Sequence, residues 1–201
     1  VHALGQVTRY VYDGNGNQTS VINPLGRAST NIFDALNRLV ATVDPLGNTN
    51  RVVYDALGKK VQTLDALSRT NQFAYDAAGR LIQVTDANGG ITAFSYDAAG
   101  NRLVTTDPNG HSTTNTVDAL SRPVQVREPG GGVYQFTYDG AGNRTGQTDP
   151  NGQIILYSYD ANNRRTTNTY PTGAPVTFAY DPNGNLTRMT DSLGASTYAY
   201  D

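Results

Sequence analysis

The chain has 201 residues, of which 37% are apolar and 16% charged, and its formal net charge is -2. The apolar share lies at the low end of globular usage, so the core must be narrow or spread out, which argues against an ordinary compact enzyme. The near-neutral charge gives no basic surface for nucleic acid. Cysteine is absent, which excludes disulfides and thiolate metal sites, and no apolar run is long enough to span a membrane.

A step from an aromatic residue to Asp recurs along the whole chain, with Val117 in place of the aromatic residue before Asp118. The spacing between successive steps is 21 residues, apart from a last spacing of 20. A fixed period of this length indicates a stacked repeat array. We therefore expect residues 1–201 to form a single continuous array of about ten repeats inside a longer protein. The Asp members of the step are Asp13, Asp34, Asp55, Asp76, Asp97, Asp118, Asp139, Asp160, Asp181 and Asp201.

A second marker follows ten residues after each of these Asp residues from Asp13 to Asp181, as in Asp107-Pro108-Asn109-Gly110. Both markers have the chemistry of tight turns, because Asp binds the backbone a few residues on, Pro presets its own φ, and Gly accepts a positive φ. In the first marker the glycine is expected at Gly79, Gly100 and Gly142. Each repeat therefore contains two turns.

Short segments rich in Thr, Val, Ile and Tyr separate the turns. They are too short for helices between such frequent breakers and are typical of strands. The sequence therefore predicts an all-β fold of tandem 21-residue β-hairpins, stacked into a spiral or solenoid-like sheet.

Two aromatic columns define one face of this predicted sheet. Residues two apart point to the same face of a strand, so the residue of the aromatic step and the residue two before it share a face. In register the rings should form two ladders of cross-strand aromatic neighbours. The second strand adds less to this stripe, since the column that begins with Val40, Val61, Ile82, Leu103 and Val124 later becomes threonine. The ladder residues are Tyr12, Phe33, Tyr54, Tyr75, Tyr96, Tyr138, Tyr159, Tyr180, Phe73, Phe94, Phe136 and Phe178.

Every acidic residue is assigned to a turn, so none is left as a candidate catalytic acid. The two turn markers account for all 17 acidic residues, ten in the first and seven in the second. His2 and His111 are the only histidines and stand in no triad spacing. The Asp13-Gly14-Asn15 and Asp181-Pro182-Asn183 stretches resemble calcium loops, but Pro24 and Ser192 stand where a bidentate Glu is needed. We expect no enzyme activity, no catalytic or metal residues and no cofactor.

A basic column lies four residues after the turn Asp. An Arg-Asp ladder is one interpretation, and a solvated row that contributes little per pair is the other. The column contains Arg38, Lys59, Arg80, Arg122 and Arg164, with Asn at the remaining positions.

The repeat unit "YDAAGRLIQVTD", with its variants "YDAAGNRLVTTD" and "FDALNRLVATVD", resembles the YD-repeat or RHS-repeat family. That family occurs in Rhs toxins, insecticidal toxin-complex proteins, wall-associated proteins and teneurins. The resemblance implies hairpins wound into a spiral sheet, which in toxins forms a hollow shell around a cytotoxic domain. The implied function is a structural scaffold: a wall segment of a shell that encloses a toxin or cargo domain.

A second hypothesis is a section of an extracellular structural or adhesive filament built from the same repeats. The sequence contains no segment resembling the family's protease region and no non-repeating toxin domain, so both hypotheses stay open. Either one predicts a secreted or cell-surface location. The expected partners are further repeats or copies joined end to end, an enclosed toxin domain, or a surface glycan or receptor, with no nucleic acid and no membrane span.

Overall fold

The computed structural model describes residues 7–200, and every regular element among them is a β-strand. The chain divides into two compact units, one of residues 1–94 with 107–109 and one of residues 95–106 with 110–201. Each unit is a run of antiparallel hairpins, so the all-β hairpin repeat expected from the sequence is confirmed.

The first unit contains strands β1 to β9. The last two residues of β9, Ser95 and Tyr96, belong to the second unit. They are β1 (Arg9–Tyr12), β2 (Gln18–Ile22), β3 (Ala28–Phe33), β4 (Leu39–Val43), β5 (Thr49–Tyr54), β6 (Lys60–Leu64), β7 (Thr70–Tyr75), β8 (Leu81–Thr85) and β9 (Ile91–Tyr96).

The second unit continues with the same alternation of strands and turns. Its strands are β10 (Arg102–Thr106), β11 (Ser112–Val117), β12 (Pro123–Arg127), β13 (Val133–Tyr138), β14 (Arg144–Thr148), β15 (Ile154–Tyr159), β16 (Arg165–Thr169), β17 (Val176–Tyr180), β18 (Leu186–Asp191) and β19 (Gly194–Thr197).

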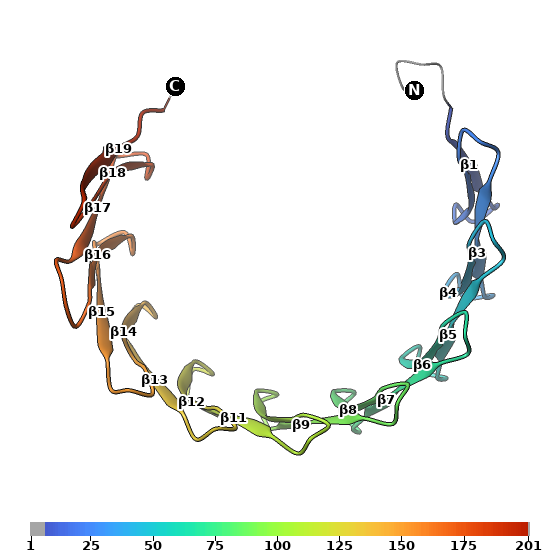
Figure 1. The fold of residues 1–201 in the computed structure, drawn as a ribbon, viewed down its shortest axis with the longest axis horizontal. Helices are drawn as coiled ribbons and strands as arrows, with labels where there is room; N and C mark the ends of the chain where they lie inside the picture. The colour runs from blue at the N-terminus through green and yellow to red at the C-terminus, as the bar shows by residue number, and fades with distance from the viewer. Residues whose placement is uncertain (1–6, 201) are drawn as a thin grey trace. The chain divides into compact units, whose positions relative to one another are not determined.

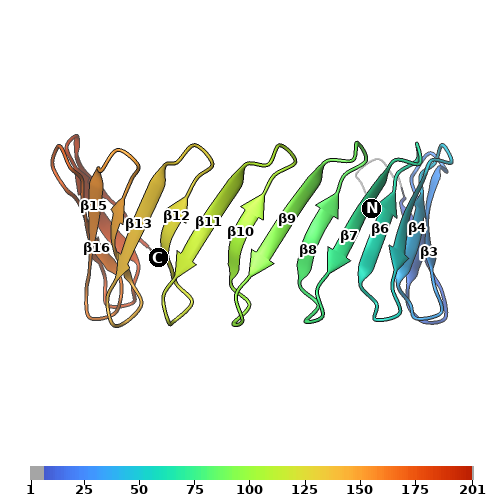
Figure 2. The same ribbon diagram turned by 90° about the horizontal axis from the view of Figure 1, so that it is seen from below.

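Within each unit every strand pairs with the next strand along the chain, and all these pairs are antiparallel (Figure 1). The turns consequently alternate between the two edges of the sheet at which the strands end, as the view from below shows (Figure 2). The edge with the aromatic-Asp motif carries what we call the first turns, and the other edge carries the second turns. Because pairing is local, each hairpin is stabilised mainly by its immediate neighbours.

Most turns of both kinds share one backbone geometry. In the first turn at Asp160, Asn163 N–H donates to Asp160 O at 3.0 Å and Asp160 N–H donates to Arg164 O at 2.9 Å. This is the three-residue hairpin loop that ends in a left-handed residue. The last second turn differs, since Asp191 pairs directly with Gly194. That shorter loop accounts for the final repeat spacing of 20 residues.

A β-bulge interrupts the pairing next to most first turns. Tyr54 pairs with Lys60 and Val53 with Gln62, which leaves Val61 as the extra residue. Thr145 is the corresponding bulged residue between β13 and β14, and its Oγ1 is 3.0 Å from Oγ1 of Thr137, which lies on the face opposite Phe136 and Tyr138. The bulged side chain therefore lies on the face opposite the aromatic columns. Val40 likewise lines a shallow trough with Ile32 and Val53. The expectation that the Val40 column adds to the aromatic stripe is therefore wrong: a bulge shifts the side chain's face, and a strict period of two does not anticipate it.

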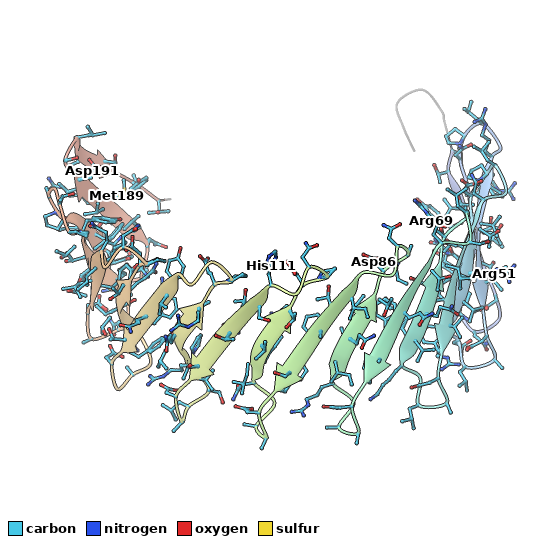
Figure 3. The ribbon with its side chains drawn as sticks, turned by 60° about the horizontal axis from the view of Figure 1, so that its bottom comes forward. Arg51, Arg69, Asp86, His111, Met189 and Asp191 are labelled. Carbon is cyan, nitrogen blue, oxygen red and sulfur yellow. The ribbon has the colours of Figure 1, made fainter. Side chains whose placement is uncertain are left out.

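Each unit is a single layer of sheet with side chains projecting from both faces (Figure 3). Among the described residues only Ala41, Gly146 and Asn168 are buried, with Ala41 at 8% and Asn168 at 9% exposure. Most strand residues are half-buried by their neighbours along the sheet. The apolar contacts are thus spread thinly along the strands, as the composition predicts, and are not gathered in one buried core.

Candidate functional site

The first turns are built around the Asp side chain. In the turn at Asp160, Oδ1 accepts hydrogen bonds from Asn162 N–H at 2.9 Å and Arg164 N–H at 3.0 Å. Oδ2 accepts a third bond from Arg164 Nε at 2.7 Å. Both carboxylate oxygens therefore hold the turn closed, and the Asp serves as the local structural anchor that its position suggests.

The predicted turn glycines lie in these loops. Gly79, Gly100 and Gly142 have φ of 82°, 93° and 91°, a region that costs an L-residue energy and glycine none. Within the described part of the chain, four positions in the left-handed region are not glycine: Asn37, Ser68, Ser121 and Asn163.

Hydrogen bonds lower the pKa of eight first-turn aspartates below the ordinary value of 3.8. For Asp118 the largest cause is the hydrogen bond from the Arg122 side chain, followed by the bond from the Arg122 backbone. For Asp139 the Asn143 side chain comes first. The pKa is lowered in the same way at Asp13, Asp34, Asp76, Asp97, Asp160 and Asp181.

Because these carboxyl pKa values are lowered in the folded state, the stability of the fold depends on pH. A carboxyl whose folded pKa lies below its unfolded pKa stabilises the fold above the unfolded value and loses that contribution as pH falls through the folded value. We expect the melting temperature to be nearly constant from about pH 6 to pH 5 and to fall steeply below about pH 4. Thermal melts followed by circular dichroism check this. A melting temperature unchanged at about pH 2 would contradict the turn-anchor role.

The ladder residues lie where the sequence places them, on one face at the ends of the odd-numbered strands. All are half-buried except Tyr12, which is 57% exposed. The Tyr hydroxyls reach back to the preceding strand, where Tyr75 donates to Lys60 O and Tyr138 to Pro123 O, both at 2.8 Å. Tyr54, Tyr159 and Tyr180 make the same bond at 3.1, 2.9 and 2.9 Å. Each of these phenols therefore fastens one strand to the one before it.

The predicted contacts between the rings of neighbouring repeats are wrong. Rings occur on odd strands, and an even strand lies between each pair, so successive rings are separated by about two strand spacings, or 10 Å. Cationic side chains fill the gap: the Arg144 guanidinium lies 5.5 Å from the Phe136 ring centroid and 5.2 Å from that of Tyr157. The Lys60 ammonium lies 4.8 Å from the Phe73 centroid. The stripe alternates rings with cations, which adds cation–π attraction to apolar burial.

We call the residue four after each first-turn Asp the donor residue, and several donor residues bind two turns. Arg122 pairs with Asp118 of its own turn at 2.7 Å and donates from Nη1 to Asp139 O of the next first turn at 3.2 Å. Its guanidinium also lies 4.6 Å from the Tyr138 centroid. Because its side chain is only 26% exposed, the solvated-row interpretation does not describe Arg122. This contact between turns was not predicted from the sequence.

The remaining chemical candidates are the two histidines. His111 is exposed at the start of the segment that leads into β11 (Figure 3), and His2 lies outside the described residues. In residues 7–200, no group of three or more His, Asp or Glu side chains could hold a metal ion. The same residues contain no helix able to cross a membrane.

The geometry defines a class of protein: a single-layer β-hairpin repeat array whose turns are anchored by Asp and whose neighbours are joined by Tyr, Arg and Asn. The profile of the family described as RHS Repeat matches residues 1–28, 75–112, 117–154, 138–175 and 180–201. These matches cover more than half of the chain, and the chain belongs to the RHS-repeat family. No curated protein matches it.

Solved structures with the same fold come from toxin complexes. The crystal structure of TcdB2-TccC3 aligns with a TM-score of 0.59 at 16% identity, covering 97% of this chain and 14% of that one. TcdB2-TccC3-TEV aligns at 0.54 and 16% identity, covering 98% and 15%. The Tc holotoxin pore of Photorhabdus luminescens aligns at 0.55 and 14% identity, covering 96% and 18%. The chain thus spans less than a fifth of these proteins, and the likeness concerns the fold.

Proposed function

We propose that this chain is a wall segment of an RHS-repeat shell that encloses a toxin or cargo domain, in a secreted or cell-surface protein. The observation that carries the proposal is the single layer: each unit is one sheet thick and has almost no buried side chains of its own. Such a layer separates two spaces rather than forming a closed pocket for a substrate. The fold likeness to toxin-complex proteins supports the same function.

The two faces of the sheet differ in a way that suits a wall. One face carries the aromatic and cationic stripe, whereas the other carries aliphatic side chains such as Ile32, Ala41 and Val53 in the first unit. Ile32 and Val53 are 46% and 41% exposed. A wall presents one of these faces to the cargo and the other to solvent, whereas a filament section leaves both accessible.

Cysteine labelling of the two faces tests the wall. Asn50→Cys and Val53→Cys form a matched pair on β5, because both sites are exposed and their odd separation places them on opposite faces. The chain has no cysteine of its own. In the native full-length protein we expect a bulky maleimide reagent to label one site and spare the other, and urea treatment to expose both. Equal rapid labelling of both sites in the native protein would contradict enclosure and favour the filament.

A further inference from the structure

The donor residue of one first turn and the left-handed residue of the next first turn vary together along the chain. Wherever the donor is Arg or Lys, the next left-handed residue is Gly, and wherever the donor is Asn, it is Asn or Ser. The pairs with a long donor are Arg38 and Gly58, Lys59 and Gly79, Arg80 and Gly100, Arg122 and Gly142, and Arg164 and Gly184. Those with a short donor are Asn17 and Asn37, Asn101 and Ser121, and Asn143 and Asn163.

The short donors find a side chain in the next turn. Asn143 Nδ2 donates to Asn163 Oδ1 at 2.8 Å while it also donates to Asp139 Oδ2 of its own turn at 3.0 Å. Asn101 Nδ2 meets Ser121 Oγ at 3.0 Å. The acceptors stand at φ of 59° and 62°, where a side chain is strained relative to glycine. The hydrogen bond across the turns gives a reason for retaining a side chain at this strained position.

The long donors need no such side chain. Arg164 Nη1 donates to the backbone carbonyl of Asp181 at 2.9 Å, and Arg122 reaches Asp139 O in the same way. With the acceptor supplied by the backbone, the left-handed residue is free to be glycine, the residue with the least strain. At Gly79 a side chain would also overlap the Lys59 ammonium.

Ser68 separates this effect from a general preference for turn residues. It is also left-handed, with a φ of 61°, but it belongs to a second turn and is exposed. Its neighbour Arg69 pairs with Asp65 of its own turn and remains 64% exposed. Ser68 thus has the strain of Ser121, but Asn48 of the preceding second turn donates to Asp44 Oδ2 of its own turn at 2.7 Å and not to Ser68.

We propose that these two positions form a matching code that determines which hairpin can follow which. A long cationic donor fits a hairpin with a glycine turn, and an asparagine donor fits a hairpin whose turn presents an Asn or Ser oxygen. The first turns therefore act as specific contacts between repeats that look interchangeable. An Asn donor that meets a glycine turn loses the link on that edge of the sheet, whereas a long donor that meets an Asn or Ser turn keeps its bond to the backbone and gains only the strain of the left-handed side chain.

A double-mutant cycle in the second unit tests the code. Arg164→Asn keeps the bond to Asp160 but is too short for the Asp181 carbonyl, so the melting temperature should fall. Gly184→Asn alone adds strain to a position with open space around it and should lower the melting temperature slightly. Together, the new Asn side chains can bond as Asn143 and Asn163 do. We expect the double variant to melt at least about 2 °C above Arg164→Asn alone.

The diagnostic result is that the effect of Gly184→Asn on the melting temperature has opposite signs in the two backgrounds. Gly184→Asn should destabilise the wild-type chain and stabilise the Arg164→Asn chain. Equal destabilisation in both backgrounds would overturn the code. Asn163→Gly and Ser68→Gly form the second comparison, since the first should lower the melting temperature and the second leave it unchanged or raise it. If Asn163→Gly also raises it, the contact across the turns does not contribute. Far-ultraviolet circular dichroism verifies that every variant retains its strands.

Discussion

Replacing Phe136 and Tyr138 together with alanine is expected to lower the melting temperature by about 10 °C. Both rings are half-buried on one face of β13, and a fully buried Phe costs about 3–5 kcal/mol when truncated, so half of that per ring is about 4 kcal/mol together. The change also removes the Tyr138 hydroxyl bond to Pro123 O and two rings that face Arg122 and Arg144. Differential scanning calorimetry measures the shift.

The control for this experiment lies in the same strand. Gln135 and Thr137 are exposed on the opposite face, so Gln135→Ala with Thr137→Ala removes side chains without touching the aromatic stripe. We expect that pair to shift the melting temperature by no more than about 2–3 °C. Equal shifts for the two pairs would show that the aromatic face is not the stabilising spine of the array.

Deleting one complete repeat should be tolerated far better than deleting one strand residue. Removal of residues 55–75 joins Tyr54 to Asp76 and preserves the period of 21, the face of every column and the pairing of a long donor, Arg38, with a glycine turn at Gly79. Removal of Gln72 alone turns the preceding part of β7 to the wrong face, because side chains alternate along a strand. Repeat arrays whose units contact only their neighbours lose stability in unit-sized steps.

Thermal melts and circular dichroism compare the two deletions. The shortened array should retain a cooperative melt and its strand signal per residue, with a modest drop in melting temperature. The Gln72 deletion should lose more, although it removes a single residue. Loss of the cooperative melt in the repeat deletion, or a wild-type melt in the Gln72 deletion, would contradict independent stacking of hairpin units.

The repeated local chemistry made the fold predictable. Asp and Gly at fixed intervals identified the turns, and the alternation around Phe136 and Tyr138 identified one face, because turn formation and strand alternation depend on residues close together in sequence. The same reasoning assigned the acidic residues to turns, where Asp160 accepts three hydrogen bonds.

Contacts between repeats were harder to predict. The position of Val61 depends on a bulge, and the bond from Arg164 to Asp181 O joins residues 17 apart whose proximity follows from strand register. The aromatic columns are real, but sequence distance alone did not reveal that an even strand carrying Arg144 lies between the rings of Phe136 and Tyr157. The matching of Asn143 with Asn163 was present in the sequence as a correlation between repeats, and its meaning required the geometry of the turns.

Electron microscopy of the native full-length particle tests the central claim, that this chain forms part of an enclosing wall. The wall function predicts a closed, hollow body with density inside it. A long, uniform fibre with an axial repeat would contradict enclosure and make the chain a section of a filament.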